Sequence, residues 1–111
     1  VMNIVGNVKN KNCVIVDDII DSGGTIVNAA KALKEKGAKD VYVYITHAVL
    51  SGEAVDKIER SAIRKLITTN TIDNSKKLKK SKKIEIISLA PMISEAMKRI
   101  ANSTSVSSLF N

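Results

Sequence analysis

Four short runs of apolar and β-branched residues recur along the chain, and each is typical of a β-strand. The first run is continuous rather than alternating, which is the pattern of a strand buried on both faces of a sheet. These runs alternate with segments of a different pattern. The sequence therefore predicts strands over residues 13–16, 41–46, 65–69 and 84–89.

Three helices are predicted between and after these runs, because apolar positions there repeat with the period of an α-helix. Gly37 supplies a left-handed stop for the first helix, Ser51 an N-cap for the second, and Pro91 a first-turn proline for the third. The side chains expected to face the core are Ile26, Ala29, Ala30, Leu33, Ala54, Val55, Ile58, Ala62, Ile93, Ala96, Met97 and Ile100.

Single helices between consecutive strands favour right-handed crossovers and therefore a parallel sheet. The predicted fold is α/β, with the element order βαβαβ-β-α. Two segments lie outside this pattern: a polar connection over residues 70–83, whose lysine-rich part is residues 74–83, and a serine-rich tail over residues 102–111. We expect one domain over residues 1–101, followed by the tail.

The net charge of +7 comes mostly from the lysine-rich connection, which holds six lysines within residues 76–83. Like charges at such density repel one another, so we expect a solvated loop. A polyanion-binding patch is the alternative. The loop has no aromatic residue on which bases would stack, which argues against a nucleic-acid partner.

The length of 111 residues suits one compact domain, and no apolar run approaches the ~20 residues that span a bilayer. Cys13 is the single cysteine and excludes an internal disulfide. No signal segment opens the chain, so we expect a cytoplasmic protein without a membrane partner. Because the first residue is Val rather than Met, we also expect a piece of a longer polypeptide.

Residues 14–25, Val-Ile-Val-Asp-Asp-Ile-Ile-Asp-Ser-Gly-Gly-Thr, carry the most informative motif. An apolar strand ends in two carboxylates and then turns into a helix, and ligands of open α/β sheets bind at the carboxyl ends of strands. The turn over residues 22–25 offers backbone N–H groups, two hydroxyls and the positive end of a helix dipole, which together favour a phosphate.

Asp17 and Asp18 would repel a phosphate, so they point to a different part of the ligand. They suit hydrogen bonds from hydroxyl groups or a bound divalent cation. A sugar phosphate, with an anion at one end and vicinal hydroxyls at the other, satisfies both requirements. Asp21 lies inside the turn, where it caps backbone N–H groups or acts on the reactive end of the sugar. The competing interpretation is a plain loop with a helix N-cap.

This motif resembles the phosphoribosyl-diphosphate signature of type I phosphoribosyltransferase-like proteins. The whole chain is similar to the C-terminal part of the ribose-phosphate diphosphokinase family, also called phosphoribosyl-diphosphate synthetases. Residues 46–52, 68–72 and 105–110 carry that wider resemblance. The resemblance implies a three-layer parallel sheet for residues 1–101.

By the resemblance, Asp17 and Asp18 contact the ribose hydroxyls and are the candidate ligands of Mg²⁺. The loop around the 5-phosphate would comprise Asp21, Ser22, Gly23, Gly24 and Thr25. The family transfers diphosphate from ATP to the C1 hydroxyl of ribose 5-phosphate, giving 5-phosphoribosyl 1-diphosphate and AMP for nucleotide biosynthesis. Its basic catalytic loop and most of its ATP site are expected before Val1, so no catalytic residue is expected here and the chain alone is predicted to be inactive.

The family also forms homo-oligomers, and its C-terminal tail helps to form a regulatory phosphate site. Ser105, Ser107 and Phe110 are the matching candidates, against the alternative of a frayed terminus. Three other functions stay open. They are a salvage phosphoribosyltransferase, for which no base-covering hood segment is visible, a non-catalytic regulatory homologue, and a polyanion-binding module.

Four remaining side-chain types have structural interpretations that we favour. His47, at the end of the second predicted strand, is expected to form hydrogen bonds rather than to transfer protons. Cys13 is expected to be a buried apolar residue. Tyr42 and Tyr44 are expected to serve packing or a subunit contact, and the methionines of the third helix are expected to fill core space.

Overall fold

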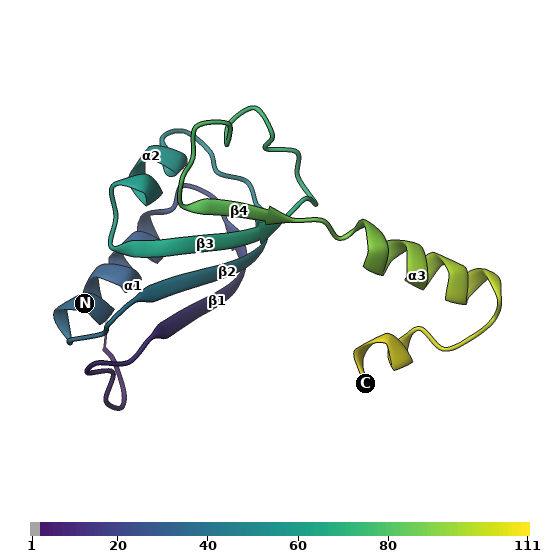
Figure 1. Ribbon diagram of the computed structural model, residues 1–111, viewed down its shortest axis with the longest axis horizontal. Coiled ribbons are helices and arrows are strands. Elements are labelled where there is room, and N and C mark those ends of the chain that lie inside the picture. Colours follow the sequence, from purple (N-terminus) through teal and green to yellow (C-terminus); the bar gives the residue numbers. More distant parts are fainter. Residues whose placement is uncertain (1–2) are drawn as a thin grey trace.

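The computed structural model describes residues 3–111 and confirms the predicted order of strands and helices (Figure 1). The elements are β1 (Cys13–Ile20), α1 (Gly24–Glu35), β2 (Val41–Ala48), α2 (Ala54–Glu59), β3 (Ile63–Thr69), β4 (Ile84–Ile87), α3 (Ala90–Ala101) and a short 3-10 helix, η1 (Ser107–Phe110). All pairings between strands are parallel, and the sheet order β1-β2-β3-β4 repeats the order of the sequence. The fold class is therefore confirmed.

Several elements begin or end at other residues than the sequence predicts, and the largest shift is at the end of β1. This strand does not stop before the two carboxylates but continues to Ile20, because its register with β2 places Asp17 beside Ile45 and Ile19 beside His47. The helix α2 begins at Ala54 rather than near Ser51. The two aspartates therefore lie within a strand rather than in the turn that follows it.

The core lies between one face of the sheet and the helices α1 and α2. Val41, Val43 and Leu66 from the strands are completely buried there, together with Ala30 of α1 and Ile58 of α2. The periodicity of the first two helices predicted this arrangement. Ala62 is an exception: it follows the end of α2 and is exposed.

The opposite face of the sheet, which we call the open face, is not covered by any of residues 3–111. Val14 is 49% exposed and Val16 is 73% exposed, so the prediction of a strand buried on both faces is wrong within this chain. Tyr44 and Ile87 are also exposed on this face. The described residues thus supply two of the three layers that the fold family implies. A continuous apolar run predicts that both sides of a strand are apolar, but it does not say which segment covers each side.

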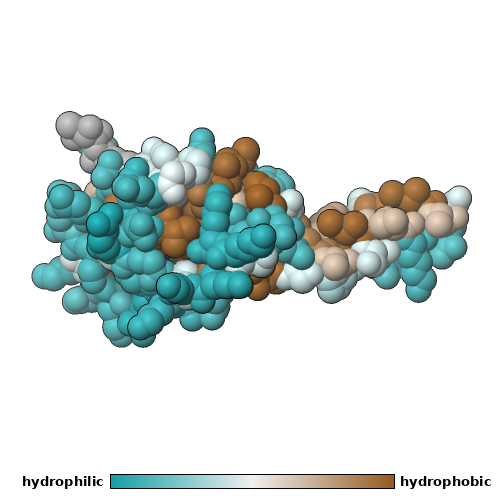
Figure 2. Space-filling model, turned by 90° about the horizontal axis from the view of Figure 1, so that it is seen from above, coloured by the Kyte–Doolittle hydropathy of each residue, from teal (hydrophilic) through white to brown (hydrophobic). Residues whose placement is uncertain are grey.

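The helix α3 is the clearest disagreement with the sequence prediction. It was expected to bury an apolar side, yet Met97 is 64% exposed, Ile100 is 68% exposed, and Met92 and Ile93 are also exposed. After β4 the chain leaves the sheet, and α3 projects away from it (Figure 1). Figure 2 shows apolar side chains along this projecting part. The periodicity correctly predicted an amphipathic helix, but the methionines do not fill a core here.

The lysine-rich loop (residues 74–83) is held against the domain, so its description as a solvated loop is correct only in part. Asn74 is buried, Leu78 packs against the core, and the Lys83 ammonium donates to the carbonyl oxygen of Ser61 at 2.8 Å. At the end of α2, the Glu59 carboxylate accepts hydrogen bonds from the Ser81 hydroxyl and from the backbone N–H groups of residues 82 and 83.

Glu59 is expected to make the anchoring of this loop sensitive to acid. Burial acts to raise the pKa of its carboxyl, but the hydrogen bonds from Ser81 and from the backbone of Lys83 and Lys82 outweigh burial and hold that pKa below the ordinary value of 4.5. A carboxyl whose pKa is lowered by folding stabilises the fold above its unfolded-state pKa, and this stabilisation is lost as pH falls through the folded-state pKa.

We therefore expect Glu59→Gln to lower the free energy of unfolding at pH 7 and to have a much smaller effect near pH 3. Urea unfolding of the unaltered chain and of Glu59→Gln, at pH 7 and near pH 3, measures the change in the free energy of unfolding. Glu35→Gln, an exposed change at the end of α1, is the matched control. An effect of Glu59→Gln that is equally large at both pH values would contradict the expectation.

Candidate functional site

The residues of the sequence motif surround a cavity of about 220 Å³ where β1 turns into α1. The cavity lies at the carboxyl end of a parallel strand, the edge of an open α/β sheet at which ligands bind. Its polar lining includes Asp17, Asp21, Ser22, Gly23 and Thr25, and the remaining lining residues are Ile19, Ile20 and Ile26. Five of the seven predicted substrate-binding residues are therefore brought together, while Asp18 and Gly24 lie outside the lining.

The N-terminus of α1 has the backbone geometry of an anion-binding site. The first helical hydrogen bond runs from the N–H of Val27 to the carbonyl oxygen of Gly23 at 3.0 Å. No side chain of residues 3–111 caps this end, and its first turn holds no acidic residue. The N–H groups of residues 24–26 are thus without a partner in the helix, and the helix dipole adds positive potential at the same place. This is the geometry that binds phosphate groups.

The two glycines of the turn have different roles. Gly23 has a φ of 85°, in the left-handed region that a residue with a Cβ atom rarely adopts. Gly24 has no such requirement, and an added Cβ atom there would meet no protein atom within 4 Å. Gly23 therefore shapes the turn, whereas Gly24 leaves open space beside it.

Replacing Gly23 with Ala is expected to destabilise the fold by about 1–2 kcal/mol, because the new side chain forces a strained left-handed backbone. Gly24→Ala is the matched control and is expected to leave the stability nearly unchanged, since space is available and Ala suits a helix. Thermal or urea unfolding measures both variants. Equal losses of stability in the two variants would contradict the different roles assigned to the glycines.

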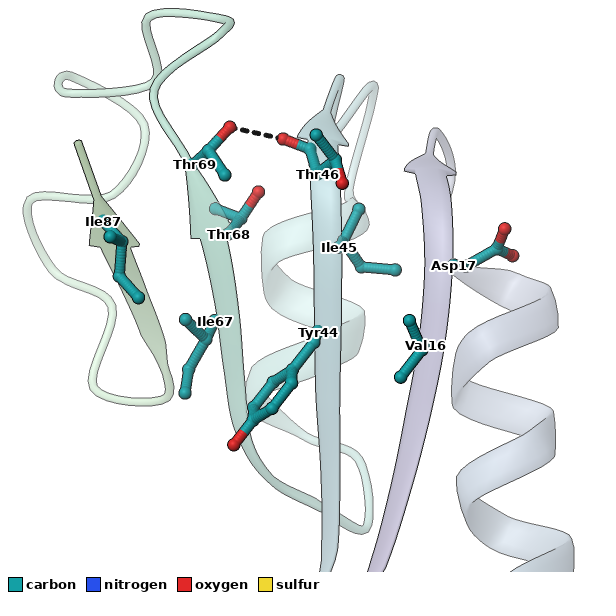
Figure 3. A pocket seen from close by; sticks show the side chains of 9 residues that line it. All are labelled: Val16, Asp17, Tyr44, Ile45, Thr46, Ile67, Thr68, Thr69 and Ile87. Carbon is teal, nitrogen blue, oxygen red and sulfur yellow. Dashed lines mark hydrogen bonds between the residues drawn. The ribbon is translucent and has the colours of Figure 1, made fainter. Parts of the chain in front are cut away.

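Only one of the two adjacent carboxylates lines this cavity. Asp17 lines the cavity, and Figure 3 shows its carboxylate on the side of β1 toward α1. Its Oδ1 atom accepts a hydrogen bond of 2.8 Å from the backbone N–H of Asp18. Asp18 is exposed and lies outside this lining. Residues 3–111 contain no group of three or more His, Cys, Asp or Glu side chains placed to hold a metal ion.

The segment after β2 holds the loop over residues 21–25 in place through backbone hydrogen bonds. This contact was not predicted from the sequence. The N–H groups of Val49 and Leu50 donate to the carbonyl oxygen of Ile20 at 2.9 and 3.3 Å. The N–H of Ser51 donates to the carbonyl oxygen of Asp21 at 3.0 Å. These bonds join residues 49–51 to the beginning of the loop over residues 21–25, and no local sequence pattern reveals such a contact.

His47 and nearby threonines form hydrogen bonds at the same edge of the sheet. The His47 Nδ1 atom lies 2.8 Å from the Thr71 hydroxyl oxygen, in keeping with the predicted hydrogen-bonding role. The Thr69 hydroxyl donates to the carbonyl oxygen of Thr46 at 2.6 Å (Figure 3). Cys13 is half-buried against the core, which fits its interpretation as an apolar residue only in part.

A second cavity, of about 390 Å³, lies on the open face (Figure 3). Its side chains are mostly apolar and include Val16, Tyr44, Ile67 and Ile87. Tyr44 is exposed here, and the packing or subunit-contact role of Tyr42 and Tyr44 stays a prediction. This cavity shares Asp17 with the cavity between β1 and α1 described above. Its lining includes no residue of α1, so the N–H groups suited to a phosphate belong to the first cavity.

The C-terminal tail folds back on α3. Arg99 donates hydrogen bonds to the carbonyl oxygen of Ser105 at 3.2 Å and to the Ser108 hydroxyl, and the Ser105 and Ser107 hydroxyl oxygens are 3.0 Å apart. A hollow of about 290 Å³ beside Arg99 is lined by Ser105 but not by Ser107. Phe110, in η1, is largely exposed. No helix among the described residues is long and apolar enough to cross a membrane.

Together, the parallel sheet and the glycine turn at the start of α1 define an α/β protein of the type I phosphoribosyltransferase-like fold. A family model described as the phosphoribosyl synthetase-associated domain matches residues 1–111, so the chain belongs to that family. The ribose-phosphate pyrophosphokinase of Clostridium tetani is 55% identical over the whole chain, which covers 34% of that protein. The corresponding protein of Hyphomonas neptunium is 51% identical, with 36% covered.

A solved structure supports the same assignment. The phosphoribosylpyrophosphate synthetase of Mycobacterium smegmatis superposes with a TM-score of 0.84 and 37% sequence identity. The match covers 89% of this chain and 33% of that protein. The chain thus spans about a third of the length of the relatives that it matches.

Proposed function

We propose that this chain is the C-terminal, ribose-5-phosphate-binding part of a ribose-phosphate diphosphokinase. The parent enzyme transfers diphosphate from ATP to the C1 hydroxyl of ribose 5-phosphate and releases 5-phosphoribosyl 1-diphosphate and AMP, which serves nucleotide biosynthesis. The observation that carries the proposal is the uncapped N-terminus of α1, which shares one cavity with Asp17 and Asp21. The relatives named ribose-phosphate pyrophosphokinase support it.

In this proposal the loop over residues 21–25 binds the 5-phosphate. The N–H groups at the start of α1 donate to the phosphate oxygens, and the Ser22 and Thr25 hydroxyls add further donors. The Asp17 carboxylate accepts hydrogen bonds from the ribose hydroxyls. The neighbouring Asp18, which is exposed and lies outside the cavity lining, is the second proposed contact to these hydroxyls. The loop thereby fixes the sugar so that its C1 hydroxyl meets the diphosphoryl donor, which is the main task in phosphoryl transfer.

Mg²⁺ fits this donor set. Magnesium in phosphoryl-transfer sites is commonly held by one or two carboxylates together with substrate phosphates. Asp17 and its neighbour Asp18 are the ligands proposed from the sequence, and Asp21 shares the cavity with Asp17. The bound ion would neutralise charge on the transferring phosphates. ATP itself would be held mostly by the rest of the parent enzyme.

Three further roles belong to the same proposal. The parent enzyme is a cytoplasmic homo-oligomer. Ser105, Ser107 and Phe110 contribute to a regulatory phosphate site in the tail. Arg99 supports this assignment, because its guanidinium lies beside Ser105 and Ser108 and carries the positive charge that a phosphate needs.

The test uses the full-length polypeptide that carries this chain, supplied with ATP, Mg²⁺ and ribose 5-phosphate. Phosphorus NMR is expected to show AMP and 5-phosphoribosyl 1-diphosphate forming in equal amounts. Ribose without its phosphate is the control and is expected to react far more slowly. Binding of ribose 5-phosphate without any AMP would instead favour a regulatory homologue, and neither binding nor turnover would overturn the proposal.

A further inference from the structure

Two side chains of the lysine-rich loop donate hydrogen bonds to three consecutive carbonyl groups at the end of β2 and just after it. The Asn74 amide donates to the carbonyl oxygen of Ala48 at 2.7 Å, and the Asn74 residue is only 3% exposed. The Lys77 ammonium donates to the carbonyl oxygens of Leu50 at 3.1 Å and Val49 at 3.3 Å. One turn of the loop therefore satisfies every carbonyl group from residue 48 to residue 50.

The backbone N–H groups of the same segment hold the loop over residues 21–25 in place. Those of residues 49–51 donate to the carbonyl oxygens of Ile20 and Asp21, as described above. Leu50, in the middle, is completely buried and has a φ of 54°, a conformation that costs energy for a residue other than glycine. Such a backbone persists only when its surroundings hold it in place. Residues 48–51 thus connect the lysine-rich loop on one side to the loop over residues 21–25 on the other.

We propose that Lys77 is a positioning residue for the phosphate-binding loop, acting through residues 49–51. This inference rests on the proposed function, because it assigns Lys77 to the ribose 5-phosphate side of the reaction. The ammonium group compensates two carbonyl dipoles at the strained backbone of Leu50, and a hydrogen bond from a charged donor is stronger than one from a neutral donor. Without it, both carbonyls lose their protein donor, and the N–H groups that hold Ile20 and Asp21 are placed less firmly.

The neighbouring lysines provide controls that distinguish the role of Lys77 from the effect of the positive charge of the loop. All three of Lys76, Lys77 and Lys79 are exposed, but only Lys77 donates side-chain hydrogen bonds within residues 3–111. Lys79→Met therefore removes the same charge and adds the same side chain as Lys77→Met, but it leaves the carbonyl groups of Val49 and Leu50 in contact with Lys77. Lys77→Arg keeps a charged donor close to the same carbonyl oxygens.

The experiment measures steady-state kinetics of the full-length polypeptide that carries this chain, with each substrate varied in turn. Lys77→Met is expected to raise the KM for ribose 5-phosphate about fivefold and to change the KM for ATP less than about twofold, as for a mutation that weakens coupling to one site. Lys79→Met is expected to match the unaltered protein, and Lys77→Arg to recover most of the loss.

Hydrogen exchange gives a readout that does not depend on turnover. In Lys77→Met the amides of Val49, Leu50 and Ser51 are expected to exchange several times faster than in Lys79→Met, since their bonds to Ile20 and Asp21 loosen. Equal exchange in the two variants would overturn the inference, whatever the activity. A loss of kcat with unchanged KM values would also overturn it, because that result indicates a smaller folded fraction. If the unaltered protein ignores ribose 5-phosphate, the proposed function fails, and exchange alone decides the structural role of Lys77.

Discussion

Replacing Asp17 and Asp18 together with Asn is expected to lower kcat/KM for ribose 5-phosphate on the order of a thousandfold in the full-length polypeptide. Each carboxylate that accepts hydrogen bonds from sugar hydroxyls contributes more than a neutral acceptor, and the change also removes negative charge from the candidate magnesium ligands. Of the single variants, Asp17→Asn is expected to have the larger effect, because Asp17 lines the cavity and Asp18 does not.

The measurement is initial velocity against ribose 5-phosphate at saturating ATP. Asp40→Asn is the control for a removed carboxylate: Asp40 lies just before β2, at the opposite edge of the sheet, in a 3.8 Å ion pair with the exposed Arg64. Such surface pairs contribute little. A kcat/KM of the double variant equal to that of the unaltered protein would exclude both aspartates from the site.

Replacing Leu66 with Ala is expected to cost about 2–5 kcal/mol of stability, a large part of the total for a small domain. Leu66 lies in β3, is completely buried, and faces the core beneath α1 and α2. Removing most of its side chain leaves a cavity that the sheet closes only in part. Urea unfolding, followed by circular dichroism, measures the change.

Val14→Ala provides the comparison on the other side of the sheet. Val14 is half exposed on the open face, so its truncation removes little buried surface and is expected to cost less than about 1 kcal/mol. If both variants lost the same stability, the open face would be as well packed as the core, which contradicts the exposure of Val14 and Val16.

The parts of the fold that the sequence predicted are those that depend on local patterns. The period of apolar residues located all four strands and all three helices, and single helices between strands predicted the parallel sheet. The environment of α3 was not predictable in this way. Its spacing of Met97 and Ile100 indicates an apolar stripe, but whether a neighbour covers that stripe depends on the path of the chain after β4.

The candidate site shows the same division. The run from Asp17 to Thr25 marked its place because the residue types and the turn lie close together in sequence. The extension of β1 past Asp17 follows from pairing with a strand more than twenty residues away. The contact of Lys77 with Val49 and Leu50 is equally remote in sequence, and in the printed sequence Lys77 looks like any other lysine of its loop.

The agreement between sheet order and sequence order bears on how the polypeptide assembles during synthesis. Each strand pairs with the one made just before it, so β2 can join β1 while β3 and β4 are still being translated. Every pairing spans only one connection, and short spans keep the entropy of loop closure low and speed folding. Within this segment the sheet can therefore grow in one direction, with β1 and its aspartates made before the strands that pair beside them.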